Sequence, residues 1–310
     1  MKAIQFDNYG DSSVLHLNEI SLPKLGAKDI MIKISAVSVN PLDIKLRNGE
    51  MKNFMPILFP FTPGLDVAGT VEKVGEKVTK FNKGDKVFAT TFGNTYSEFV
   101  SLEESIVSKM PKILNFAEAA AAAIPLTTAY TLLLQDGNLK AGQTILVHGA
   151  AGGVGHILVQ MAKNLGAKVI ATATGEGLEF VKSNGASEVI DYKDDQKLQR
   201  IKGVDMVVDL VGGETHFQSY NKLKPGGILL STVMPGSEEL ANKFGITTKF
   251  VNATPDSKKL DFGSKYVENG NIKVKVFRKF SLDDAAAAQN FVVQERILGK
   301  VVLEVIEPKI

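Results

Sequence analysis

The chain has 310 residues, of which 44% are hydrophobic and 23% are charged, and its formal net charge is +2. This length predicts two domains, and the balance of apolar and charged residues is that of a globular protein rather than a disordered chain. The small net charge, with Lys and Arg interleaved among Asp and Glu, argues against nucleic acid as a partner. The sequence has no cysteine, which excludes disulfides, thiolate nucleophiles and cysteine-ligated metal sites.

The sequence offers no signal for secretion or for membrane insertion. Residues 1–11 lack the apolar core of a signal peptide, and no stretch approaches the roughly 18 consecutive apolar residues of a membrane span. We therefore expect a cytoplasmic protein that does not associate with membranes.

Residues 1–115 predict a mainly antiparallel, β-rich domain. Short runs of β-branched residues are broken there by Pro, Gly and Asn-Pro. The predicted strands include Ile30–Ser35, Val67–Val74 and Lys86–Ala89. An Ala-rich helix at Leu282–Gln294 precedes a last strand, Lys300–Val305, which we expect to return to this domain. The first domain therefore comprises residues 1–115 and 280–310.

Residues 116–279 predict a doubly wound α/β domain of the Rossmann type. The domain opens with an Ala-rich helical stretch, Phe116–Leu134, which Pro125 interrupts, and continues with alternating strands and helices. Such alternation predicts a parallel sheet covered by helices. The predicted strands are Thr144–His148, Lys168–Thr172, Asp205–Leu210 and Ile228–Thr232, and the predicted helices lie at about Gly153–Leu165 and Gly177–Asn184.

The strongest chemical signal is a glycine-rich turn between a strand and a helix. Residues 145–155 read ILVHGAAGGVG. Small residues in the pattern AxGxxG allow a tight turn, a close approach of backbone amides to a pyrophosphate, and close packing of helix on strand. The flanking strands and helix agree with this interpretation, so we predict a dinucleotide site. Its residues here are Ala150, Gly152, Gly153, Val154 and Gly155.

The end of the second predicted strand favours NADPH over NADH. NAD-dependent enzymes generally place an Asp or Glu at this point to bind the ribose hydroxyls, whereas this strand ends in the sequence ATAT. The hydroxyls of Thr172 and Thr174, with a cation from Lys182 or Lys193, could hold a 2′-phosphate. Glu176 could still reach a ribose if its loop folds back, although a solvated residue near a helix start is the simpler interpretation.

Seven motifs occur in the order of a known family: Ser38–Gly49, Pro63–Gly69, Leu126–Tyr130, Gly149–Gly155, Asp191–Lys193, Asp209–Gly213 and Gly299–Val302. Nearly the whole chain resembles the zinc-independent quinone oxidoreductase branch of the medium-chain dehydrogenase/reductase superfamily. This branch includes ζ-crystallin-like quinone reductases and alkenal or enone oxidoreductases. The resemblance implies a GroES-like catalytic domain beside the Rossmann domain. It also implies a homodimer formed through an edge strand, for which Thr248–Asn252 is the candidate.

The resemblance further implies that no metal is bound. Zinc-dependent relatives have a Cys at the position of Asn40 and a His at that of Leu65, and their cysteines for a structural zinc are missing here. The four histidines, at positions 16, 148, 156 and 216, are too scattered to replace them. Without a Lewis acid, hydride transfer needs an acceptor that is already electrophilic, such as a quinone or an α,β-unsaturated carbonyl.

The same resemblance assigns candidate catalytic residues. It places Asn40 and Thr128 beside the nicotinamide, with Asn40 donating its amide to the substrate oxygen or the ribose; a turn residue before Pro41 is the alternative interpretation. Lys45 stands where many quinone reductases have Tyr and alkenal-type members have Lys, which favours enones or enals. An ordinary exposed lysine is the alternative there.

The remaining candidate residues bind the cofactor. Tyr192 and Lys193 match the family's adenosine-phosphate region, and Lys193 is the preferred cation for the 2′-phosphate. Gly212, Ser231 and Val233 lie at the ends of later strands, where doubly wound sheets bind ligands.

The sequence therefore predicts an NADPH-dependent oxidoreductase that transfers hydride to a small-molecule quinone or enone. Hydrogen bonds would stabilise the resulting enolate, which solvent or a side chain would protonate. Two alternatives remain. One is an NADPH-binding protein with little turnover. The other is an enoyl-thioester reductase, which needs a basic patch for a carrier's phosphate that the sequence does not display.

Overall fold

The computed structural model describes residues 1–305, which form two compact units. The first unit comprises Met1–Ile124, Pro255–Ser264 and the chain from Lys275 onward, and the second comprises Pro125–Thr254 and Lys265–Val274. The division falls inside helices α2 (Phe116–Tyr130) and α8 (Ser257–Glu268). The predicted domain limits at residues 115, 116, 279 and 280 stay a prediction.

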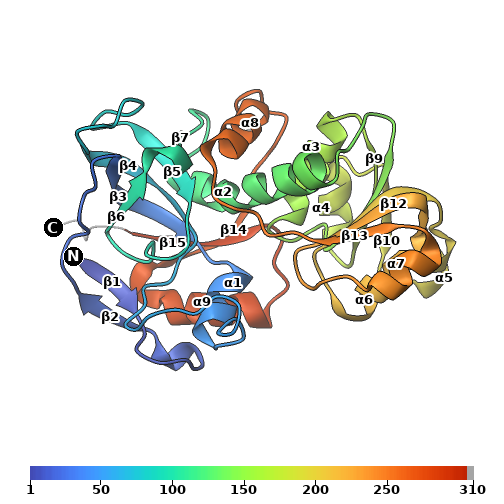
Figure 1. The fold of residues 1–310 in the computed structure, drawn as a ribbon, viewed down its shortest axis with the longest axis horizontal. Helices are drawn as coiled ribbons and strands as arrows, with labels where there is room; N and C mark the ends of the chain where they lie inside the picture. The colour runs from blue at the N-terminus through green and yellow to red at the C-terminus, as the bar shows by residue number, and fades with distance from the viewer. Residues whose placement is uncertain (306–310) are drawn as a thin grey trace. The chain divides into compact units, whose positions relative to one another are not determined.

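Within residues 1–305, the first unit is built on a seven-stranded, mainly antiparallel sheet (Figure 1). Its strand order is β14-β15-β3-β4-β5-β7, with β6 paired to β3. The strands are β3 (Asp29–Ser38), β4 (Asp66–Val74), β5 (Lys86–Thr90), β6 (Phe99–Glu103), β7 (Val107–Lys109), β14 (Val276–Ser281) and β15 (Lys300–Glu304). A separate hairpin-like pair consists of β1 (Lys2–Gln5) and β2 (His16–Glu19). Strand β15 pairs antiparallel with β3, so the predicted return of the last strand to this unit is confirmed.

The core of the first unit lies between this sheet and helix α9 (Ala285–Gln294). Alternating apolar residues of β3, such as Ile30, Ile32 and Ile34, are buried with Ala285 and Ala288 of the helix. The small alanine side chains let the helix lie close to the sheet. The predicted helix at Leu282–Gln294 is confirmed, with its first turn formed by the 3₁₀ segment η5 (Leu282–Asp284).

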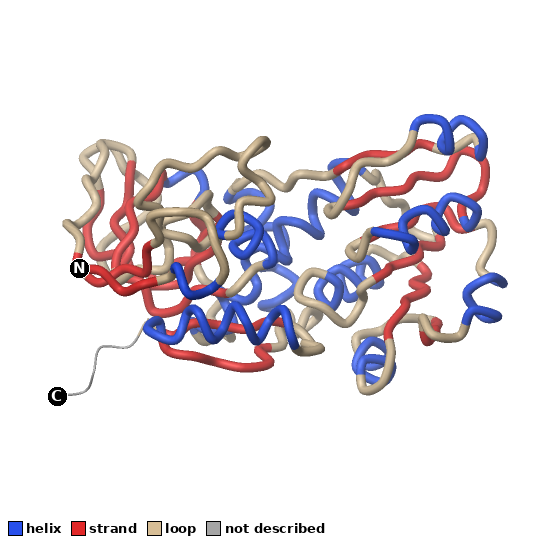
Figure 2. Tube along the Cα trace, turned by 90° about the horizontal axis from the view of Figure 1, so that it is seen from below, coloured by secondary structure: helices blue, strands red, loops and turns tan. Residues whose placement is uncertain are grey.

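The second unit contains a parallel sheet of six strands within the described chain, in the order β10-β9-β8-β11-β12-β13. The strands are β8 (Thr144–His148), β9 (Lys168–Ala173), β10 (Glu188–Asp191), β11 (Val204–Asp209), β12 (Leu223–Ser231) and β13 (Thr247–Phe250). The helices between them are α3 (Gly155–Asn164), α4 (Gly177–Ser183), α5 (Asp195–Arg200), α6 (Gly213–Ser219) and α7 (Glu238–Phe244). Strands and helices alternate along this unit, as Figure 2 shows in red and blue.

The direction in which this sheet is wound changes between β8 and β11. Strands β9 and β10 follow β8 on one side, whereas β11, β12 and β13 continue on the other. Ligands of doubly wound sheets bind at the carboxyl ends of the strands that flank such a point. The predicted doubly wound α/β fold is confirmed, and its topology directs attention to His148 and Asp209, the last residues of β8 and β11.

Helix α2 departs from the prediction, because Pro125 lies inside it without interrupting it. Proline removes one backbone N–H, but the surrounding alanines are strong helix formers and keep the helix intact. A π-helical segment, η3 (Thr131–Asp136), continues it. By length and composition, Phe116–Asp136 could cross a membrane, yet 78% of its apolar window is buried, as in the core helix of a globular protein.

Candidate functional site

The glycine-rich turn connects β8 to α3, as the dinucleotide motif requires. Gly149 has a φ of +73°, a conformation that residues with a Cβ rarely adopt. A Cβ on Gly155 would lie 2.2 Å from the carbonyl oxygen of Gly149, so only glycine lets α3 begin against the turn. Within residues 1–305, the backbone N–H groups of Gly153 and Val154 have no hydrogen-bond partner. This arrangement suits an anionic group at the start of the helix.

Other predicted cofactor residues gather at the carboxyl edge of the same sheet. Ala173 of β9 is in register with Asp191 of β10, so Thr174, Tyr192 and Lys193 all follow neighbouring strand ends. Tyr192 is 45% exposed, Lys193 is exposed and Thr174 is partly exposed. The two threonines differ, because Thr172 is buried.

The side chain of Thr172 contacts the histidine that directly precedes the glycine-rich turn. Its Oγ1 lies 3.0 Å from Nδ1 of His148, the last residue of β8. Burial lowers the pKa of His148 to about 4, so its ring is neutral near pH 7. The hydroxyl of Thr172 thereby orients a neutral ring, which leaves Thr174 as the more accessible hydroxyl of the pair.

Asp209, which the sequence analysis did not single out as a site residue, connects the loops that follow β11 and β12. Its Oδ1 accepts hydrogen bonds from the backbone N–H groups of Val211 and Gly212, each at 2.9 Å. Its Oδ2 accepts from Ser231 Oγ at 3.2 Å and lies 2.9 Å from Nδ1 of buried His216. Burial by itself would raise the pKa of Asp209, but these hydrogen bonds and the His216 ring lower it below the usual value.

The loops joined by Asp209 contain three predicted cofactor residues. Ser231 Oγ accepts a hydrogen bond from the backbone N–H of Val233 at 3.1 Å. Gly212 has a φ of +80°, and a Cβ there would lie 3.0 Å from Val233 Cγ1. The structure therefore brings Gly212, Ser231 and Val233 together. Thr128, also in the second unit, is a buried residue of α2.

In the first unit, Asn40 lies in a buried polar network at the start of helix α1 (Pro41–Arg47). Its Nδ2 donates to Asp66 Oδ2 at 3.0 Å and to the Ser38 carbonyl at 3.1 Å. Its Oδ1 accepts from Lys300 Nζ at 2.6 Å. Ser38 also donates to Asp66, through both its backbone N–H and its hydroxyl. Both amide hydrogens of Asn40 therefore have protein partners.

Asp43 is a second buried carboxylate beside this network. Its Oδ2 accepts from the Asn40 backbone N–H at 2.8 Å, and its Oδ1 accepts from that of Gly64 at 3.0 Å. Tyr96 OH lies at 3.5 Å from Oδ2. The side chains of Asp43 and Asp66 are fully buried. Asp43 therefore fixes the start of α1 and the Gly64 turn against each other.

Burial and mutual charge perturb the ionisation of the whole cluster. Desolvation, with the negative charge of Asp66, raises the pKa of Asp43 to about 7. Desolvation likewise raises the pKa of Asp66, although Lys300 and the hydrogen bonds from Ser38 and Asn40 oppose it. It lowers the pKa of Lys300 against the opposing effect of both carboxylates. Clusters of this kind are a mark of functional sites.

Lys45 and Arg47 lie further along α1. Lys45 is partly exposed, and its ammonium has no hydrogen-bond or ion-pair partner in the described part of the chain. Arg47 is only 5% exposed, and its Nε and Nη1 have no hydrogen-bond partners there either. Burial lowers the pKa of Arg47 below its usual value. Arg47 was not predicted as a site residue, because charge and spacing in a sequence do not reveal burial.

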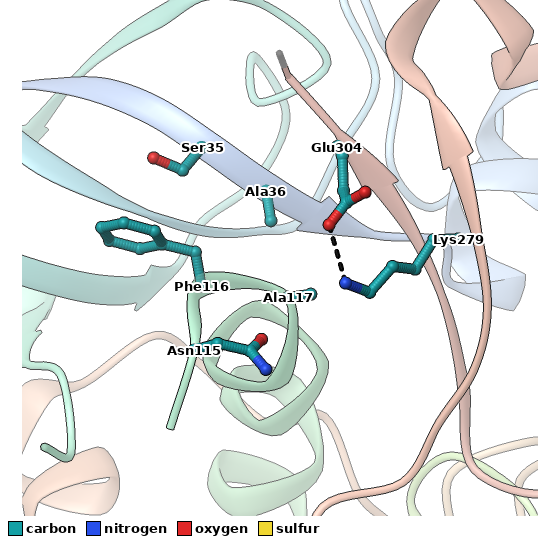
Figure 3. A pocket seen from close by; sticks show the side chains of 7 residues that line it. All are labelled: Ser35, Ala36, Asn115, Phe116, Ala117, Lys279 and Glu304. Carbon is teal, nitrogen blue, oxygen red and sulfur yellow. Dashed lines mark hydrogen bonds and ion pairs between the residues drawn. The ribbon is translucent and has the colours of Figure 1, made fainter. Parts of the chain in front are cut away.

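Two pockets of similar size lie in the first unit. A pocket of about 300 Å³ lies between the start of α2 and strands β3, β14 and β15, where Lys279 and Glu304 form an ion pair (Figure 3). None of the predicted site residues lines it. A pocket of about 360 Å³ adjoins α1 and is lined by Leu46, Met55, Pro56, Ile57, Leu58, Pro60, Phe61, Thr62, Phe92 and Asn94. This second pocket is largely apolar and its lining is uncharged.

The first unit does not offer the donor set of a zinc site. At the two positions where zinc-dependent relatives have Cys and His, this chain has the amide of Asn40 and the hydrocarbon side chain of Leu65. Among residues 1–305, no group of three or more His, Asp or Glu side chains could hold a metal ion. The Asn40 oxygen already accepts from an ammonium. These residues therefore do not fit zinc.

Two family models match large parts of the chain. Residues 26–112 match the family described as "Alcohol dehydrogenase GroES-like domain", and residues 184–303 match "Zinc-binding dehydrogenase". The chain is similar to a quinone oxidoreductase of Lama guanicoe, with 38% identity over 249 residues, which cover 77% of this chain and 75% of that protein.

Two further similarities extend over nearly the whole chain. A 2-methylene-furan-3-one reductase of Solanum lycopersicum is 35% identical over 98% of this chain and 79% of that protein. The solved structure of the Escherichia coli quinone oxidoreductase complexed with NADPH has a TM-score of 0.89 and 27% identity, and covers 98% of this chain and 100% of that one.

The raised pKa of Asp43 predicts a pH-dependent stability. Because the folded chain binds this proton up to about pH 7 and the unfolded chain only up to about pH 4, stability decreases as the pH rises through that window. We expect the melting temperature of the wild type to fall more steeply between about pH 5 and about pH 8 than that of Asp43→Asn, measured by differential scanning fluorimetry. Asp66, Lys300 and Tyr96, which face Asp43, remain in both proteins. Exposed Asp283→Asn is the control, and parallel slopes for Asp43→Asn and wild type would assign the titration to another group.

Proposed function

This chain belongs to the medium-chain dehydrogenase/reductase superfamily, and we propose that it is a zinc-independent, NADPH-dependent oxidoreductase that reduces a quinone or the double bond of an α,β-unsaturated carbonyl. The observation that carries the proposal is the combination of a dinucleotide turn in one unit with a network in the other that lacks zinc ligands. The quinone oxidoreductases and the furanone reductase among its relatives favour the same class of reaction.

The second unit would bind NADPH along the carboxyl edge of its sheet. When bound, NADPH would supply the hydride. The free N–H groups of Gly153 and Val154 would receive the pyrophosphate, with Ala150, Gly152 and Gly155 allowing its close approach. No carboxylate ends β9, so a 2′-phosphate would meet the Thr174 hydroxyl and the Lys193 ammonium instead. The NADPH complex of the Escherichia coli relative supports this choice.

The first unit would bind the electron acceptor. The apolar pocket beside α1 suits a neutral, largely hydrophobic molecule, since its lining carries no charge. Lys45, whose ammonium lacks a protein partner in residues 1–305, would donate a hydrogen bond to the acceptor carbonyl or to the ribose. Asn40 would act by holding the loop before α1, because both its amide hydrogens are already bonded.

The uncharged lining of the apolar pocket argues against the enoyl-thioester alternative. A carrier's phosphate would need cations near the pocket. A protein that binds NADPH with little turnover would leave the buried charges of the first unit without a chemical role. A homodimer formed through the edge strand β13 stays a prediction, and Phe250 at that edge, which is 48% exposed, would suit such a contact. A cytoplasmic location also stays a prediction.

The reaction is tested by following NADPH oxidation with a simple quinone, an α,β-unsaturated ketone and a saturated aldehyde. We expect the conjugated acceptors to react at least about 100-fold faster than the aldehyde, because without a Lewis acid only they are sufficiently electrophilic. Treatment with a strong chelator should leave the rate unchanged. Turnover of the aldehyde alone, or loss of activity on chelation, would show that the zinc-free mechanism is wrong.

The choice of cofactor is tested at Lys193. We expect Lys193→Ala to weaken NADPH binding about 5- to 10-fold and NADH binding hardly at all, because only NADPH carries the 2′-phosphate. Nicotinamide fluorescence titrations measure both dissociation constants. Lys182→Ala tests the other candidate cation, and Lys197→Ala is the control, since that exposed lysine pairs with Asp194. Equal losses for the two cofactors would remove Lys193 from the phosphate site.

The loops after β11 and β12 are tested at Asp209. We expect Asp209→Asn to weaken the binding of NADPH and NADH alike, by about 10-fold, because its single remaining oxygen cannot accept both from the Gly212 loop and from Ser231. Asp205→Asn is a matched control at the opposite end of the same strand, where Asp205 accepts from the Thr144 backbone. Unchanged affinity in a folded Asp209→Asn protein would show that these loops do not contact the cofactor.

A further inference from the structure

Lys300 is the first residue of β15, but its side chain does not turn to solvent as a lysine at a strand start ordinarily does. It is only 5% exposed, and its Nζ reaches the loop between β3 and α1. There it donates to the Val39 carbonyl at 2.9 Å and to Asn40 Oδ1 at 2.6 Å. Burying an ammonium costs several kcal/mol unless it is well compensated. A residue that only begins a strand has no need of a buried ammonium, so that cost calls for another role.

The chemistry of its neighbours defines how Asn40 is oriented. An ammonium can only donate hydrogen bonds and a carboxylate can only accept them. The Asn40 oxygen must therefore face Lys300, and its NH₂ group must face Asp66. The amide bridges a buried cation and a buried anion, which leaves it a single favourable orientation.

The charges around Asn40 resemble those of a metal site in one respect. The Lys300 ammonium lies against the Asn40 oxygen, as a metal ion lies against an oxygen ligand. The carboxylates of Asp66 and Asp43 balance this positive charge, and both favour the charged form of Lys300. The description "Zinc-binding dehydrogenase" belongs to the family matched by residues 184–303, which include Lys300, whereas the residues around Asn40 do not fit that metal. In this chain the positive charge is the ammonium of Lys300, which is covalently part of strand β15.

We propose that Lys300 is a positioning residue whose ammonium provides the fixed charge of a missing zinc site and holds Asn40, and with it the start of α1, in place for reduction of the acceptor. This inference rests on the proposed function. Lys300 acts through Asn40 and α1, which carries Lys45 and borders the apolar pocket through Leu46. The residues that would hold the pyrophosphate and the 2′-phosphate lie in the second unit, so the effect of Lys300 should appear mainly in the reduction step and only weakly in cofactor binding.

The charge is tested by chemical rescue. Lys300→Ala removes the atoms of propylammonium from the side chain, so we expect kcat to fall about 10- to 100-fold while the dissociation constant of NADPH changes less than about 2-fold. Added propylammonium should restore at least about 5-fold of kcat, whereas 1-propanol, of the same shape but uncharged, should restore none. Lys279→Ala is the control, because that lysine forms an exposed ion pair on neighbouring β14 and should retain full activity.

A second experiment does not depend on activity. The melting temperatures of Lys300→Met, Asp66→Asn and the double variant form a cycle. Each single variant leaves a buried charge without the opposite charge on the other side of Asn40 and should lower the melting temperature by several degrees. The double variant should lose clearly less than the sum of the two. Additive losses would mean that the charges of Lys300 and Asp66 do not interact, which would contradict the proposed role of the Lys300 charge.

The outcomes separate this inference from the proposed function. If the wild type oxidises NADPH with neither the quinone nor the α,β-unsaturated ketone, the proposed function is wrong. The catalytic part of this inference is then wrong as well. If the wild type is active but folded Lys300→Ala keeps its kcat, or 1-propanol rescues as well as propylammonium, Lys300 contributes packing only and the positioning role is wrong.

Discussion

The first unit is organised by the need to satisfy charges that have no access to water. Asp43, Asp66 and Lys300 come from α1, β4 and β15, and all three are buried. Each must find partners, because an unpaired buried charge is far more costly than an unpaired neutral group. The backbone N–H groups of Asn40 and Gly64 and the side chains of Ser38 and Asn40 supply them. The bonds from Lys300 to the Val39 carbonyl and to Asn40 Oδ1 add the longest connections, between residues more than two hundred positions apart in the chain.

The second unit depends on a steric constraint instead. Helix α3 can start against β8 only because Gly155 has no Cβ. Asp209 then orders the loops after β11 and β12 from within the sheet. The edge where a ligand would bind is therefore held by backbone geometry and by one buried carboxylate, which allows it to be formed before any ligand arrives.

The similarities to known proteins and the chemistry of the site answer different questions. The family descriptions mention alcohol dehydrogenases and zinc, whereas the relatives of high coverage include a quinone oxidoreductase and a furanone reductase. Family membership by itself does not choose among these reactions. The amide of Asn40 between an ammonium and a carboxylate is a property of this chain, and the proposed zinc-independent reaction starts from it.

The sequence by itself determined the fold class and the dinucleotide turn, because strand–helix alternation and the spacing of small residues are local patterns. Strands β8 and β9 and helices α3 and α4 lie within one or two residues of their predicted limits. Strand β10, with four residues, and helix α5, with six, were not predicted, since such short segments carry too little periodicity.

Only the tertiary structure decided which polar residues share a site. In the sequence, Lys300 marks only the start of a predicted strand and Asp43 only one position of the motif Ser38–Gly49. No local signal separated Thr172, which is buried against His148, from Thr174. Burial and pairing depend on contacts between distant segments, such as the 2.6 Å bond between Lys300 and Asn40. A sequence pattern records what each residue can donate or accept, but the partner it finds is fixed only when the sheet brings β15 beside β3.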